Sequence, residues 1–189
     1  MRLWMKPALS AIVGVLIGAI VALSPSPALA VVRITFYSHD GNGLYFPHAF
    51  VTLRGVDDRS GRSVDLSYGF TTPHAGPHVL SGPVTGVLEL VQPDYIAHST
   101  PHFSMPLSSA QVAGVIAVAE RWRRLPQPSY ELWSQNCVVF VAQIAARLGL
   151  AADLPSELVI KPSGFLDYLT RNNLQRLGAR GAQLHRATD

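Results

Sequence analysis

Apolar and polar residues alternate in several short runs between residues 31 and 107. Such alternation is typical of β-strands that bury one face, and it predicts strands at Val31–Tyr37, His48–Val56, Ser63–Phe70, Val84–Val91 and Ser99–Met105. A short polar segment, residues 57–62, joins the second and third of these runs, so we expect a hairpin. Residues 71–83 are rich in Pro, Gly and His and predict a long surface loop.

The apolar spacing becomes helical after residue 107. Ser108 and Gln111 have the spacing of a capping box, and apolar residues follow at intervals of three and four. A second helix is expected over Cys137–Leu148, with Gly149 just past its end, and a third from about Ser163.

The order of these elements predicts the fold class. Strands followed by helices, without βαβ alternation, predict an α+β fold in which an antiparallel β-meander packs on two or three helices. We expect one domain over residues 31–177, followed by a flexible tail over residues 178–189.

The first thirty residues have the pattern of an export signal. A basic start is followed by the uncharged apolar stretch Pro7–Leu23, and small residues stand at Ala28 and Ala30. The alternative is an uncleaved anchor helix, but Pro25 and Pro27 would interrupt it. We therefore expect cleavage after Ala30, a periplasmic or secreted protein, and no integral membrane association after cleavage.

Composition narrows the classes of function. The chain of 189 residues is 48% hydrophobic and 14% charged, and residues 31–189 carry 13 basic and 12 acidic side chains. A nearly neutral domain gives no electrostatic reason to expect nucleic acid. The basic cluster Arg121–Arg124 is expected to close a helix, where cations complement the helix dipole. A single cysteine excludes an internal disulfide and a Cys-rich metal site.

That cysteine is the main candidate for chemistry. Cys137 stands where a polar turn enters an apolar helix, and free N–H groups at a helix start favour a thiolate. The alternative is a buried structural cysteine, since free Cys often packs as a small hydrophobe. An exported, unpaired thiol is exposed to oxidation, which favours the nucleophile.

A thiol nucleophile needs a base within hydrogen-bond reach. His48 is the candidate because it begins a strongly apolar strand whose end can face the start of a helix. The alternative for His48 is a half-buried polar residue at a strand edge. The other six histidines lie in or beside expected loops or in the tail: His39, His74, His78, His98, His102 and His185.

The sequences around these two residues resemble a known superfamily. Phe-Pro-His-Ala-Phe-Val at residues 46–51, followed by Asn-Cys-Val-Val-Phe-Val at residues 136–141, resembles the circularly permuted branch of the NlpC-type, papain-like enzymes, which includes lecithin retinol acyltransferase-like proteins. In that branch the His strand precedes the Cys helix. The resemblance implies a permuted papain-like fold with Cys137 as nucleophile and His48 as base.

The chain departs from that pattern in two places. The acyltransferase-like proteins have Glu-His after the Cys, where this chain has Val138 and Val139, and they carry a second His near the end of the next strand. Here Tyr68 is the closest topological match, His74 would need its loop to fold back, and Asp65 lies on the opposite strand face.

The segment that precedes Cys137 contains three candidates for substrate contact. Gln135 and Asn136 could supply an oxyanion-stabilising amide, or could cap the helix. Trp133 could line a substrate groove or belong to the core.

The sequence thus predicts an exported cysteine-dependent hydrolase or acyltransferase that acts on an amide or ester. The resemblance implies a cell-wall (peptidoglycan) peptide as the first substrate to consider. The alternative is a catalytically inactive domain of the same fold that has a binding or structural role in the cell envelope. No cofactor is expected. The histidine pairs 74/78 and 98/102 lie outside expected helices, where a four-residue spacing does not align metal ligands, so no metal is expected either.

Overall fold

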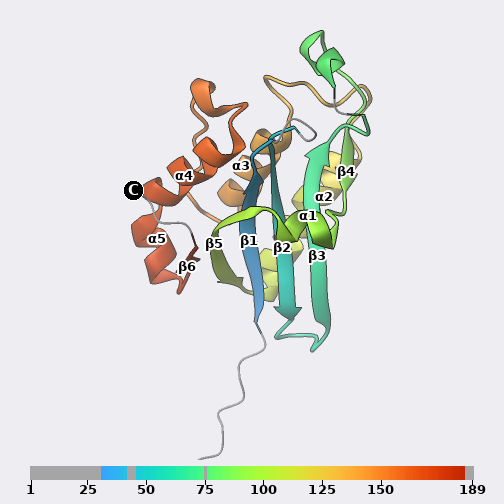
Figure 1. The fold of residues 1–189 in the computed structure, drawn as a ribbon. Coiled ribbons are helices and arrows are strands. Elements are labelled where there is room, and N and C mark those ends of the chain that lie inside the picture. The colour runs from blue at the N-terminus through green and yellow to red at the C-terminus, as the bar shows by residue number, and fades with distance from the viewer. Residues whose placement is uncertain (1–30, 42–45, 75, 186–189) are drawn as a thin grey trace, which may run out of the picture.

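The computed structural model describes residues 31–41, 46–74 and 76–185. Its strands are β1 (Val32–His39), β2 (His48–Val56), β3 (Ser63–Thr71), β4 (Val87–Glu89), β5 (Thr100–Leu107) and β6 (Gln183–Leu184). Its helices are α1 (Pro93–Ala97), α2 (Ser109–Arg123), α3 (Cys137–Arg147), α4 (Pro162–Asn172) and α5 (Leu174–Ala179), with short 3-10 turns η1 (Pro77–Leu80) and η2 (Ser156–Leu158). Figure 1 shows their arrangement.

The strands form one antiparallel sheet in the order β4-β3-β2-β1-β5-β6. The expected strand His48–Val56 is β2, and its hairpin with β3 pairs Phe50 with Gly69 and Val56 with Ser63. The predicted α+β class with an antiparallel sheet is therefore confirmed.

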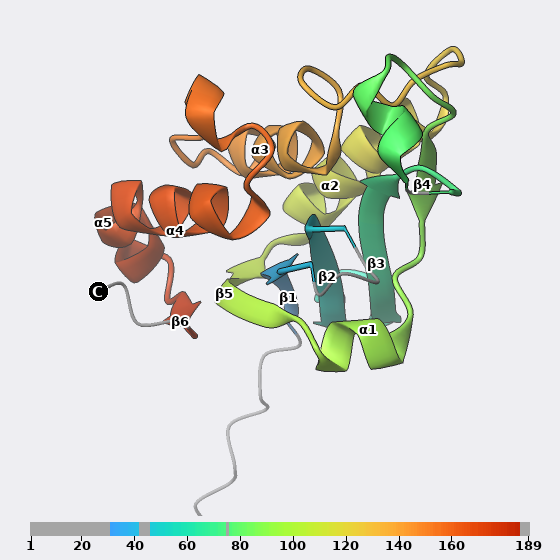
Figure 2. The ribbon, with the colours of Figure 1, turned by 45° about the horizontal axis from the view of Figure 1, so that its top comes forward.

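The two faces of this sheet bury different sets of side chains. Ala49 and Val51 of β2 belong to the main hydrophobic core, together with residues of α2, α3 and α4. Phe50, between them, packs instead with Val91 and Ile96, which lie before and within α1. Figure 2 shows α2, α3 and α4 on one side of the sheet and α1 on the other. Because successive side chains of a strand point to opposite faces, β2 is buried on both.

The helix ends follow the sequence signals closely. The Ser108 side chain accepts from the Gln111 backbone while the Gln111 side chain accepts from the Ser108 backbone, which completes the capping box of α2. Asn136 caps α3, and Gly149 follows α3 with a φ of +78°, a left-handed conformation that glycine adopts without strain.

One expected strand is shorter in the structure, and one helix was not predicted. Of the expected strand Val84–Val91, only the central residues form a strand, which is β4. The chain then forms the unpredicted helix α1, whose first turn contains Pro93. Proline favours the first turn of a helix because its missing N–H needs no partner there.

The described part of the expected flexible tail, residues 178–185, contains the end of α5 and the strand β6. Leu177 is fully buried at the end of α5, and β6 pairs Gln183 and Leu184 with the outer edge of β5. His185 extends this contact, because its backbone N–H donates to the carbonyl of His102. An apolar residue at 177 and an open sheet edge are what hold this segment in place.

The expected export signal and its cleavage point lie outside the described residues. None of the helices within the described ranges combines the length and the apolar character that crossing a bilayer requires.

Candidate active site

A cavity of about 540 Å³ opens at the end of the sheet where β2 begins and β3 ends. Cys137 and His48, 89 positions apart in the sequence, both line it. Its wall combines residues from both faces of the sheet, including Val138 from the main core and Tyr95 from the α1 side. The fold therefore brings the two expected catalytic residues to one concave site.

Cys137 is the first residue of α3, as the sequence predicts, but its thiol is enclosed. The residue is only 4% exposed, and burial raises the pKa of the thiol to about 11. The backbone groups of Ala49, Val138 and Cys137 itself pull that pKa down, yet their effect is smaller than the cost of desolvating a thiolate. The helix start therefore does not produce an ionised thiol here.

His48 begins β2 and its ring lies toward the α1 side of the sheet. The ring packs near Phe50 and Tyr95, with centroid separations of 6.0 and 6.3 Å. Burial lowers the pKa of His48 to about 4, and the neighbouring His39 contributes in the same direction. His48 is therefore a neutral imidazole at neutral pH.

The ring nitrogen Nε2 of His48 has no hydrogen-bond partner among the described residues. It lies against the Cα of Gly69: a Cβ added there would be 2.5 Å from Nε2. Among the described residues, no polar group therefore orients the ring through this nitrogen, because the backbone of Gly69 lies against it. An unsatisfied buried nitrogen costs roughly 1–3 kcal/mol.

The candidates for the third catalytic position lie elsewhere. Tyr68 is buried in the main core on the opposite face from the His48 ring, and burial together with Glu120 raises the pKa of its hydroxyl. Asp65 is exposed and pairs with Arg54 at 3.1 Å. Neither Tyr68 nor Asp65 lines the cavity.

Asn136 acts as a cap, which is one of its two predicted roles. Its Oδ1 accepts from the N–H groups of Val138 and Val139 at 2.8 and 3.0 Å, and its Nδ2 donates to the carbonyl of Val159 at 2.8 Å. Its polar atoms are thus committed to structure, although the residue lines the cavity.

The other two substrate-contact candidates do not line the cavity. Gln135 donates to the carbonyl of Ser129 and lines a separate shallow depression beside Trp122. Trp133 is 58% exposed and is not part of the cavity wall.

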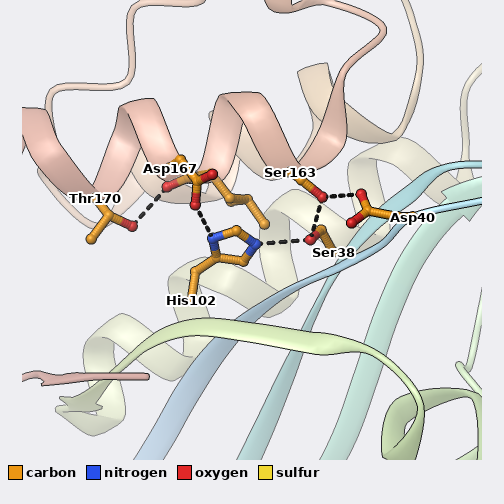
Figure 3. Close-up of polar contacts among 7 residues, drawn as sticks. Ser38, Asp40, His102, Ser163, Asp167 and Thr170 are labelled. Atoms are coloured by element: carbon orange, nitrogen blue, oxygen red, sulfur yellow. Dashed lines mark hydrogen bonds and ion pairs between the residues drawn. The ribbon is translucent and has the colours of Figure 1, made fainter. Parts of the chain in front are cut away.

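A second polar group, which the sequence analysis missed, lies between β1, β5 and α4 (Figure 3). His102 Nε2 is 2.8 Å from Ser38 Oγ, and His102 Nδ1 is 2.9 Å from Asp167 Oδ1. Ser163 Oγ is 2.8 Å from Ser38 Oγ and also donates to Asp40. We call these five residues the His102 chain.

A β-bulge aims His102 at this group. The β1–β5 register steps from Phe36↔Phe103 to Tyr37↔Pro101, so His102 is an extra residue in β5. Without that extra residue, His102 and Phe103 would point to opposite faces; the bulge lets both reach the helix side. The sequence spacing of Ser163 and Asp167 on one helical face was visible, but the bulge was not.

The histidine pairs do not assemble a metal site. His98 Nδ1 lies 2.7 Å from the carbonyl of Asp94, whereas His102 belongs to the chain just described. Within the described ranges no group of three or more His, Cys, Asp or Glu side chains could hold a metal ion.

Comparison of the chain with protein-family models, with curated proteins and with solved structures gives no match.

Proposed function

We propose that this protein is an exported cysteine-dependent hydrolase or acyltransferase in which Cys137 attacks the carbonyl of an ester or amide and His48 carries the proton. The observation that carries the proposal is that the cavity is lined by both residues, one at the start of α3 and one at the start of β2. The chain order, with the histidine strand before the cysteine helix, supports a circularly permuted papain-like arrangement.

The rim of the cavity favours an apolar acyl group. Four large hydrophobic residues of its wall remain exposed, by 37–69%: Phe46, Leu80, Leu90 and Ile160. Large apolar side chains left in water around a concave site mark a binding surface. Glu89 is the acidic residue in this wall, and desolvation of its carboxylate raises its pKa. An apolar acyl chain therefore suits this rim better than a charged cell-wall peptide.

The reaction proceeds through an acyl-enzyme. The Cys137 proton passes to His48 as sulfur bonds to the carbonyl carbon, and the bond from that carbon to the leaving oxygen or nitrogen breaks. His48 returns the proton to the leaving group. Water or an acceptor hydroxyl then gives a proton to His48, attacks the thioester and releases the acyl product, which restores the thiol.

The two pKa values decide how the proton moves. A thiol with a pKa of about 11 and an imidazole with a pKa of about 4 are both neutral at pH 7. Moving the proton from the thiol to the imidazole therefore costs roughly 10 kcal/mol before the attraction between the two charges is counted. The attraction between the two opposite charges would offset only part of this cost. The thiolate therefore does not accumulate, and proton transfer accompanies attack.

The test is to trap the acyl-enzyme. Purified protein is incubated with p-nitrophenyl esters of increasing acyl length, and intact-mass spectrometry measures the acyl adduct on its single cysteine. We expect an adduct that forms faster with longer chains, none in Cys137→Ala, and a large loss of rate in His48→Ala. His98→Ala is the matched control, because His98 is exposed and does not line the cavity, and it should retain the rate.

A second function follows from the same pKa values, which favour an inert thiol. In this alternative the cavity binds an apolar ligand without chemistry. It predicts that wild type and Cys137→Ala bind a fluorescent fatty acid equally and that neither forms an adduct with any ester. An adduct that depends on both Cys137 and His48 excludes this alternative, whereas binding without any adduct excludes the enzyme.

A further inference from the structure

The His102 chain links two carboxylates through buried side chains. From one end to the other it runs Asp167, His102, Ser38, Ser163, Asp40. His102 is 1% exposed and Ser38 is fully buried, while the Asp167 side chain is 25% exposed. Figure 3 shows these side chains between α4 and the sheet.

Ser38, His102 and Asp167 have the order of contacts found in a Ser-His-Asp triad, with the base between nucleophile and carboxylate. Ser38 has no accessible surface, however, and it does not line the cavity. A carbonyl carbon cannot approach a sealed hydroxyl, so this chain is not a second nucleophilic site.

The number of hydrogens in the chain points to a different property. Asp40, as a carboxylate, only accepts, so Ser163 must give its single hydrogen to Asp40. Ser38 must then donate to Ser163, and His102 Nε2 must donate to Ser38. This leaves His102 Nδ1 at 2.9 Å from the Asp167 carboxylate. Two bare acceptors at that distance would repel, so Nδ1 carries a hydrogen as well.

We propose that His102 carries protons on both ring nitrogens at neutral pH, and that the second proton holds the first turns of α4 against β1 and β5 until alkaline conditions remove it. When His102 is a neutral imidazole, the His102 chain has four polar contacts but only three hydrogens that can be donated. Loss of the proton therefore breaks one contact, and it leaves an acceptor facing an acceptor inside the protein.

The charged groups around His102 fit a retained proton. Asp167 faces the ring from α4. Asp40, which follows β1, is linked to the ring through Ser163 and Ser38. On the β6 side, the His185 ring bonds Ser104 Oγ at 2.7 Å. Arg33 of β1 donates to the Ser104 carbonyl at 3.3 Å. The two groups that reach His102 through the chain are both anionic, which raises the affinity of a histidine for its proton.

The proton bears on the cavity because α4 carries part of the cavity wall. Ile160 and Pro162 line the cavity immediately before Ser163. The carbonyl of Val159 accepts from Asn136, the residue that caps the cysteine helix. Loosening the start of α4 therefore widens the cavity next to Cys137.

The experiment measures the two ring nitrogens of His102 by NMR in the full protein labelled with nitrogen-15. We expect both to be protonated at pH 7, and Asp167→Asn to lower the proton affinity of His102 roughly tenfold to a thousandfold, the usual effect of removing an opposite charge. The asparagine oxygen can still accept from Nδ1, so the fold is retained. Exposed Asp153→Asn is the control and should change nothing.

Two outcomes overturn the proposal: a single protonated nitrogen at pH 7, or an unchanged proton affinity in Asp167→Asn. A second measurement tests the link to the cavity. Binding of a fluorescent fatty acid to Cys137→Ala should change with pH over the range in which His102 titrates, and this pH dependence should shift to lower pH in Asp167→Asn. Neither readout requires catalysis, so failure here is separate from failure of the proposed enzyme.

Discussion

The Nε2 atom of His48 rests on the Cα of Gly69, with room for no side chain between them. Gly69 needs no left-handed backbone, so Gly69→Ala acts through this contact rather than through strain in the chain. Its Cβ would be 2.5 Å from Nε2 and must displace the ring. We expect a loss of about 1–3 kcal/mol in the free energy of unfolding, as for overpacking in a core, and a loss of acyl-enzyme formation. Urea unfolding and the ester assay measure the two effects.

The control for this substitution is Gly178→Ala. Gly178 lies in α5 with nothing within 4 Å of its added Cβ, so alanine there should be neutral or stabilising, by up to about 1 kcal/mol. The double variant Gly69→Ala/His48→Ala removes the clashing ring. If Gly69→Ala costs as much without the ring as with it, the contact with His48 is not the cause.

Acid should destabilise the protein through His48. The unfolded chain binds a proton at His48 below about pH 6.5, whereas the folded protein binds it only near pH 4. Stability is therefore retained above pH 6.5 and falls as the pH drops from 6.5 to 4, by roughly 3 kcal/mol in total. Urea unfolding across this range should show that loss in wild type and a smaller one in His48→Gln. The exposed His98→Gln variant should behave like wild type.

The sequence was most informative where a local signal and the tertiary contacts agree. The strand His48–Val56 is buried on both faces in its first half, which agrees with the three consecutive apolar residues Ala49, Phe50 and Val51. The capping box at Ser108 depends on two residues three positions apart and needs no distant partner. The contact of β6 with the edge of β5 depends on residues about 80 positions apart, and no local pattern in the tail shows it.

The site was harder to predict than the fold because its chemistry depends on burial. The position of Cys137 at a helix start was correctly predicted, but the dipole of the helix and the cost of desolvation oppose each other. Only the structure shows that desolvation is larger. His102 lies within the expected strand Ser99–Met105, but no sequence signal predicts that its side chain is almost fully buried. Its direction depends on a one-residue bulge, which alternation of polar and apolar residues cannot reveal.

The cap that Asn136 forms on α3 and the cap that Ser108 forms on α2 should differ in strength. Asn136→Ala removes two bonds to helix N–H groups and the two donations to the carbonyls of Leu132 and Val159, all at a residue 1% exposed. We expect a loss of about 3 kcal/mol, combining a lost cap with unsatisfied buried groups. Ser108→Ala removes an exposed cap and should cost about 1 kcal/mol. Thermal and urea unfolding compare the two variants.

Asn136→Asp separates the two contributions of this side chain. It keeps the oxygen that caps α3 and loses the donor to Leu132 and Val159, so its cost should lie between those of Ser108→Ala and Asn136→Ala. A cost equal to that of Asn136→Ala would mean that the donations to Leu132 and Val159, rather than the cap, hold this region together.

The reactivity of the single thiol tests the electrostatics of the site directly. With a pKa of about 11 against an ordinary value of 9, Cys137 holds roughly a hundredfold less thiolate at neutral pH than in the unfolded chain. Because the thiolate is the species that iodoacetamide alkylates, folded protein should react at least about a hundredfold more slowly than protein in urea. The rate should keep rising with pH toward 11. Cys137→Ser is the blank for labelling at other residues. Rapid alkylation below pH 8 would show instead that the thiol is ionised in the folded protein, and that the helix start outweighs burial after all.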